Sequence, residues 1–138
     1  MLTSVNLNFL DHLQNLTSLT LFVDITLEKE VKLPQLHTLT LSDLNLQFLS
    51  NFTCPLLTYL TINIRNESIQ HVNSITDFVN KCTAIKKFEY WGKALLQIQT
   101  KNMEEIVAYI VDSDRKTLEF AFHVLNSSVQ LSTFQISA

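Results

Sequence analysis

The segment LPQLHTLTL, residues 33–41, carries leucines separated by three, three and two positions: Leu33, Leu36, Leu39 and Leu41. The last two leucines are two residues apart, so both side chains point to one side of a short β-strand. The earlier ones are three residues apart, which suits a turn that brings the chain over a core. One such unit buries little apolar surface by itself, and we therefore expect several units to stack.

The same spacing recurs on both sides of this segment. Three further units show it with leucine or a conservative replacement: Leu13, Leu16, Leu19 and Leu21; Cys54, Leu57, Leu60 and Ile62; Cys82, Ile85, Phe88 and Tyr90. Two weaker copies end in Leu118 and Phe120 and in Leu131, Phe134 and Ile136. Stacked parallel strands predict two inward columns of side chains: Leu19, Leu39, Leu60 and Phe88, and beside them Leu21, Leu41, Ile62 and Tyr90.

The segments between the units predict different local structures. Residues 26–32, TLEKEVK, alternate in polarity and predict an extended connection, whereas the apolar residues between 46 and 52 predict irregular or 3₁₀ turns. Apolar residues three or four apart predict a helix from Glu67 to Cys82, with Asn66 or Ser68 as its N-cap. The same period predicts a second helix over 102–112, through Met103, Ile106, Val107 and Ile110. The apolar residues 95–98 are a candidate for an extra short strand.

Composition bounds the class of protein. The chain has 138 residues, of which 46% are hydrophobic and 17% charged, so it is long enough for one domain and too apolar for a disordered one. A net charge of −3 argues against a protein dedicated to nucleic acid or anionic membranes. The single glycine, Gly92, excludes glycine-rich phosphate loops. No apolar run approaches the roughly 18 residues of a membrane span. Met1 is not followed by a charged region and an apolar core, so we expect no secretory signal.

The phrases that begin at Leu33-Pro34 and at Cys54-Pro55 resemble the leucine-rich repeats of F-box proteins, especially the large fungal set. The resemblance covers about residues 13 to 90. It implies an α/β fold: a single leucine-rich-repeat solenoid over 1–138, with a curved parallel sheet, an irregular convex side and helices toward the C-terminal half. Its repeats would be centred near residues 19, 39, 60, 88, 118 and 134.

The resemblance also implies a function and a location. The chain would be the substrate-recruiting region of a ubiquitin ligase subunit in the cytoplasm or nucleus. A cullin-ligase adaptor would bind through F-box helices, which are not visible in these 138 residues. Regular repeats have asparagine three residues after the last strand leucine, but this chain has Asp24, Leu44, Arg65 and Lys93 there. We therefore expect an irregular arc.

The concave face of the sheet is the candidate protein-binding surface. Residues that flank the inward pairs predict three outward rows: Thr20, Thr40, Thr61, Glu89 and Glu119; Phe22, Ser42, Asn63 and Trp91; Ser18, Thr38, Tyr59 and Lys87. From these we select as binding residues Thr20, Thr40, Tyr59, Thr61, Glu89 and Trp91, with the two aromatics as anchors. The alternative is that threonine rows merely suit a sheet surface and that Trp91 packs under a loop near Gly92.

No residue pattern points to catalysis or to a metal. Cys54 and Cys82 hold the same position in neighbouring units, so a disulfide is conceivable, but two buried thiols are favoured. The histidines show no i, i+4 pairing with another ligand: His12, His37, His71 and His123. The paired acids suit a turn and a helix start: Asp112 and Asp114, Glu104 and Glu105. We expect no cofactor, no metal and no enzymatic activity.

Two functions therefore stay open. The first is a protein–protein interaction scaffold that serves as the substrate-recognition part of an F-box-type ubiquitin ligase adaptor. The second is a leucine-rich structural or extracellular recognition module with no link to ubiquitin. An F-box-like helical segment in the full reading frame would favour the first function. A Cys54–Cys82 bridge would favour the second.

Overall fold

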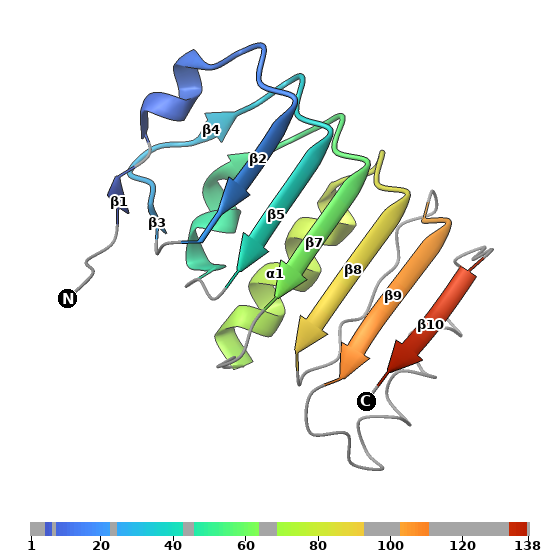
Figure 1. Cartoon of the computed structure of the whole chain (residues 1–138). Coiled ribbons are helices and arrows are strands. Elements are labelled where there is room, and N and C mark those ends of the chain that lie inside the picture. The colour runs from blue at the N-terminus through green and yellow to red at the C-terminus, as the bar shows by residue number, and fades with distance from the viewer. Residues whose placement is uncertain are drawn as a thin grey trace.

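The computed structural model of the chain is a mixed α/β fold built on a parallel sheet (Figure 1). It describes residues 5–6, 8–22, 25–42, 46–63, 69–92, 103–110 and 133–137. The main sheet has six strands in the order β10-β9-β8-β7-β5-β2, and all neighbours are parallel. Its strands are β2 Ser18–Leu21, β5 Thr38–Ser42, β7 Tyr59–Asn63, β8 Lys87–Gly92, β9 Glu105–Ile110 and β10 Thr133–Ser137.

Smaller elements lie beside this sheet. Two short parallel pairs are formed by β1 Val5–Asn6 with β3 Ile25–Thr26, and by β4 Val31–Lys32 with β6 Phe52–Thr53. The helical elements are the 3₁₀ helices η1 Asn8–His12 and η2 Leu46–Asn51, and the α-helix α1 Ile69–Lys81. The helix predicted from Glu67 to Cys82 and the 3₁₀ turn near residue 48 are thus confirmed. In Figure 1, η2 and α1 lie on one side of the sheet, and the described elements leave its other face uncovered.

The predicted inward columns are confirmed by the strand register. Leu39 pairs in register with Leu19 on one side and with Leu60 on the other, and Phe88 follows Leu60. The second column has the same order, through Leu21, Leu41, Ile62 and Tyr90. All of these side chains are buried except Leu19, which is partly buried because β2 is an edge strand.

A β-turn begins each unit, as the three-residue spacing predicts. The N–H of the second apolar residue bonds to the carbonyl of the first, with N···O distances of 3.1 to 3.4 Å, in Leu13–Leu16, Leu33–Leu36, Cys54–Leu57 and Cys82–Ile85. Pro34 and Pro55 hold the second position of their turns, where the fixed φ of proline is favourable. The leucine spacing is therefore the signature of a turn followed by a strand.

A repeated backbone contact joins each unit to the next. The carbonyl just before a strand accepts two N–H bonds of 2.8 to 3.1 Å from the following unit: Thr17 from His37 and Thr38, His37 from Thr58 and Tyr59, Thr58 from Lys86 and Lys87, and Lys86 from Glu104 and Glu105. The same geometry thus recurs at four successive junctions.

One core fills the space between the sheet and its helical side. Phe52 packs edge-to-face against Phe48 of η2 and Phe78 of α1, at centroid distances of 5.8 and 6.3 Å. These rings belong to the same buried cluster as the inward columns. Cys54 and Cys82 are also buried there and carry free thiols, as the favoured interpretation predicts.

The helix predicted over 102–112 is wrong, because residues 105–110 form strand β9. Met103, Ile106 and Ala108 repeat the three-and-two spacing of the earlier units, and Met103 is buried as Leu36 and Leu57 are. The residues that suggested a helix fit both periods. Residues 105–110 form a strand because they pair with β8 on one side and with β10 on the other, and such tertiary pairing overrides local helix propensity.

The strand that follows β8 in the sheet is therefore β9 and not a unit near residue 118. Ile106 continues the column of Phe88, and Phe134 of β10 comes next, so the strand expected near 134 is confirmed. The row position next to Glu89, expected for Glu119, belongs to Val107. The expected strand ending in Leu118 and Phe120, and the candidate strand at 95–98, lie outside the described residues.

Candidate binding site on the exposed sheet face

Side chains alternate along each strand, so the face opposite α1 carries its own rows of residues. The register places in three rows Ser18, Thr38, Tyr59, Lys87 and Glu105; Thr20, Thr40, Thr61, Glu89 and Val107; and Ser42, Asn63 and Trp91. We call this surface the exposed face. The predicted rows are confirmed from β2 to β8, with the exception of Phe22. Phe22 lies beyond the end of β2, outside the paired register, and is 68% exposed.

The N-terminal half of the exposed face is polar and uncharged. Its side chains on β2, β5 and β7 carry hydroxyl or amide groups and are at least partly open to solvent: Ser18, Thr20, Thr38, Thr40, Ser42, Tyr59, Thr61 and Asn63. Branched threonines suit a sheet surface and lose little conformational freedom there. This half is a stiff surface that can accept and donate hydrogen bonds.

A cluster of aromatic and charged side chains is centred on Glu89 of β8. The hydroxyl of Tyr59 donates a hydrogen bond of 2.9 Å to Oε2 of Glu89. The indole Nε1–H of Trp91 donates one of 3.3 Å to Oε1 of the same carboxylate. Trp91 is nonetheless 37% exposed, so its ring is partly accessible at the surface. We call Tyr59, Lys87, Glu89, Trp91 and Glu105 the β8 cluster.

Lys87 occupies the other side of the β8 cluster. Its Nζ lies 4.9 Å from the centroid of the Tyr59 ring and 3.7 Å from Oε2 of Glu105. Interaction with the Tyr59 phenol, and then with the carboxylates of Glu105 and Glu89, raises the pKa of Lys87 above its ordinary value. The ammonium group is therefore fully charged at neutral pH and is held between a ring face and a carboxylate.

The structure brings together three of the six predicted binding residues. Tyr59, Glu89 and Trp91 meet in the β8 cluster, and Thr61 adjoins Glu89 in the register. Thr40 and Thr20 lie on the next two strands of the same row, with Thr20 at the edge of the sheet. The sequence reasoning did not select Lys87 as a binding residue, although it placed Lys87 in an outward row.

Glu105 is the member of the β8 cluster that sequence reasoning assigned to a different role. It was expected in the first turn of a helix, but it lies on β9 beside Lys87. The spacing of Met103, Ile106 and Ala108, three and then two residues, is that of the earlier turn-and-strand units and could have placed Glu105 on a strand. Val107, on the same strand, adjoins Glu89 in the register and is buried, whereas the Glu105 side chain is 34% exposed.

The buried thiols are poorly suited to chemistry. Desolvation raises the pKa of Cys82 to about 12 and raises the pKa of Cys54 still further, where the neighbouring Cys82 adds to the effect. Both groups therefore stay protonated at neutral pH, and the thiolate is the nucleophilic form.

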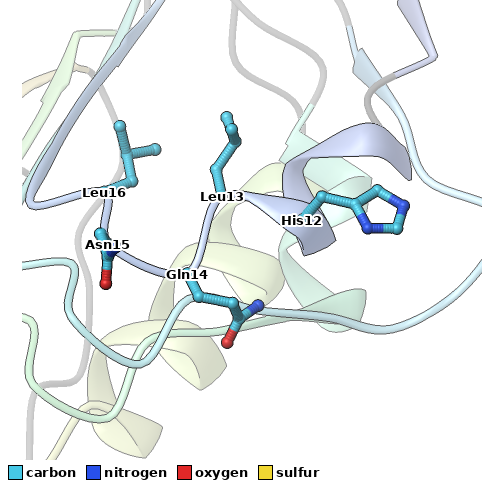
Figure 2. A pocket seen from close by; sticks show the side chains of 5 residues that line it. All are labelled: His12, Leu13, Gln14, Asn15 and Leu16. Carbon is cyan, nitrogen blue, oxygen red and sulfur yellow. The ribbon is translucent and has the colours of Figure 1, made fainter.

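Figure 2 shows a hollow beside the loop between η1 and β2, lined by the consecutive residues His12–Leu16. The Gln14 amide donates hydrogen bonds to the carbonyls of Asp11 and Lys32, which fixes the loop. The side chains of His12, Gln14 and Leu16 point in different directions (Figure 2). An active site needs polar groups that converge on one point, and this hollow lacks that arrangement.

Two further observations concern metals and membranes. In the part of the chain that the structure describes, no three His, Cys, Asp or Glu side chains are grouped so that they could hold a metal ion. None of the helices described there combines the length and the apolar character that a membrane crossing requires.

Comparisons of the chain with protein-family models, with curated proteins and with solved structures find no match.

Proposed function

We propose that this chain is a protein-interaction scaffold that binds a partner across its exposed face. The observation that carries the proposal is the β8 cluster, which sets two aromatic side chains around a fixed carboxylate beside rows of small hydroxyl groups. Tryptophan and tyrosine are enriched among the residues that dominate binding energy at protein interfaces. Their hydrogen bonds to Glu89 hold them in place before binding, which lowers the entropy cost of association.

The scaffold that we propose is an irregular leucine-rich-repeat solenoid. Support comes from the repeated turn and strand, and from the carbonyl contact that recurs between successive units. In a solenoid each unit contacts mainly its neighbours, and the sheet offers one extended surface to a partner. The proposed concave surface corresponds to the exposed face.

A narrower proposal concerns the biological role. The likeness of the Leu33-Pro34 and Cys54-Pro55 phrases to F-box proteins supports a substrate-recruiting role in a ubiquitin ligase, in the cytoplasm or nucleus. In that role the F-box helices would contact the cullin adaptor, and the exposed face would hold the substrate. The competing role is that of a leucine-rich recognition module with no link to ubiquitin, and the experiment below distinguishes the two roles.

The experiment is quantitative affinity purification from cells of the source organism, with the full-length gene product as the bait. We compare the natural protein with Trp91→Ala on the exposed face and with Leu56→Ala, which truncates an exposed apolar side chain in the turn before β7. We expect Trp91→Ala to reduce recovery of a bound protein by about tenfold or more, because loss of a dominant interface residue costs about 2 kcal/mol or more. Leu56→Ala should leave recovery unchanged.

The same purification separates the two roles. Co-purifying cullin and adaptor would support the ligase role, and their reproducible absence beside a bound partner would leave a recognition scaffold without it. Equal recovery of every bound protein by the natural chain and by Trp91→Ala would contradict binding through the exposed face.

A further inference from the structure

Both carboxylate oxygens of Glu89 accept hydrogen bonds from side chains of the β8 cluster. The two donors, the Tyr59 hydroxyl and the Trp91 indole, are neutral. Each carboxylate oxygen can accept more than one hydrogen bond, so the group has acceptor capacity left. Lys87 is the nearby cation, and its ammonium group is paired with Glu105. The described charged side chains of the exposed face are therefore two carboxylates and one ammonium group, with a net charge of −1.

We infer that the β8 cluster is a subsite for an arginine side chain of the bound partner, which would stack on Trp91 and pair with Glu89. The inference rests on the proposed function, since it names the partner chemistry of the same surface. An arginine guanidinium is planar, donates through several N–H groups and stacks on aromatic rings. The β8 cluster offers a partner for each of these properties. The Glu89 carboxylate can accept the N–H groups, and the aromatic side chains hydrogen-bonded to it offer a ring for stacking.

The protein already holds a cation by this chemistry. Lys87 places its ammonium group over the Tyr59 ring and near a carboxylate, at 4.9 and 3.7 Å. Glu89 offers the same combination on the Trp91 side.

Other partner chemistries fit this cluster less well. An acidic peptide or a phosphate group would meet the carboxylates of Glu89 and Glu105, while the one ammonium group is already paired with Glu105. A purely apolar segment would leave the charge of Glu89 buried and unpaired, which is costly. A lysine would satisfy the charge, but its compact ammonium cannot make the planar, two-pronged contact that a guanidinium makes.

The test begins with random peptides displayed on phage and selected on the natural chain. We expect arginine to be enriched at one position of the selected peptides. The tightest binder is then synthesised with arginine, lysine or the uncharged isostere citrulline at that position. Binding is followed by isothermal titration calorimetry, which needs no fluorophore and so also serves for Trp91→Ala, the variant that lacks the chain's one tryptophan.

We expect citrulline to weaken binding by about tenfold or more, because a hydrogen bond to a charged group contributes about 1.5 to 3 kcal/mol. The peptide with lysine should bind with an affinity between those of the arginine and citrulline peptides. Glu89→Gln should remove most of the difference between arginine and citrulline. Lys87→Gln should tighten arginine binding, because it removes a competing cation, and a merely structural role of the cluster would not produce opposite shifts. Circular dichroism checks that each variant is folded.

The failures of the inference and of the proposed function are distinguishable. Peptides that bind equally well with arginine and citrulline, but are lost with Trp91→Ala, would overturn the arginine subsite and leave the exposed face as a binding surface. Unchanged discrimination between arginine and citrulline in Glu89→Gln would also overturn the subsite. Peptides that bind the natural chain and Trp91→Ala with equal affinity would count against both.

Discussion

Leu13 and Leu33 hold the same position in neighbouring units, and the stack gives them very different environments. Leu33 is 0% exposed, because units lie on both sides of it, whereas Leu13 is 40% exposed at the edge that begins with β2. Substitution of each leucine by alanine removes the same atoms from the same repeat position. The pair therefore measures what stacking contributes to stability, with residue type and local turn held constant.

The magnitudes follow from burial. Truncation of a fully buried leucine to alanine loses about 2.4 kcal/mol of transfer free energy, at about 0.8 kcal/mol for each methylene. A closed core also leaves a cavity, so Leu33→Ala should cost about 3 to 4 kcal/mol of unfolding free energy. Leu13 has lost only 60% of its exposure, and at an open edge no closed cavity forms, so Leu13→Ala should cost about 1.4 kcal/mol. The expected difference is about 2 kcal/mol.

Urea unfolding, followed by circular dichroism and by the fluorescence of Trp91, measures this difference. With a denaturant slope near 2 kcal/mol per molar, the two midpoints should differ by about 1 M, and the slopes should agree. Equal midpoints for the two variants would show that the position in the stack does not determine the burial of these leucines in solution.

Leu39→Asp places an unpaired charge in the central column and should abolish the cooperative thermal transition, measured by calorimetry, whereas Thr40→Asp on the exposed face should retain it. Trp91→Ala should lower Tm by only a few degrees, since the ring is partly exposed; a loss as large as that of Leu33→Ala would make it a core residue. Burial raises the pKa of Cys82 from 9.0 to about 12, so unfolded chains lose this proton at lower pH than folded ones. The urea midpoint of the natural chain should therefore fall as the pH rises above about 9. In Cys82→Ala the midpoint should fall less steeply over the same pH range.

Much of the fold could be predicted because equivalent residues of the repeated units pair in register in neighbouring strands. The spacing of Leu33, Leu36, Leu39 and Leu41 encodes a turn and a strand with a period that no single helix satisfies, and four aligned copies fix which residues become neighbours. The helix α1 is equally clear, since its segment is long and its apolar residues fall three and four apart.

The remainder could not be predicted for a physical reason that Met103, Ile106 and Val107 illustrate. Their spacing fits a helix, and the choice of a strand depends on hydrogen bonds that two neighbouring strands supply. The error carried over to the candidate site, because Glu105 was placed in a helix and its pairing with Lys87 was missed. The outward rows were predictable from alternation, but the hydrogen bonds to Glu89 depend on side-chain conformations that sequence spacing does not fix.

Photochemical footprinting of the chain, with and without its co-purified partner, shows which surface the partner covers. A diazirine reagent labels accessible side chains, and the chain provides Tyr59 and Trp91 on the exposed face and Phe9 and Leu56 away from it. Binding across the exposed face predicts that the partner protects Tyr59 and Trp91 and leaves Phe9 and Leu56 labelled. Protection of Phe9 or Leu56, with Tyr59 and Trp91 labelled as in the free chain, would contradict the account.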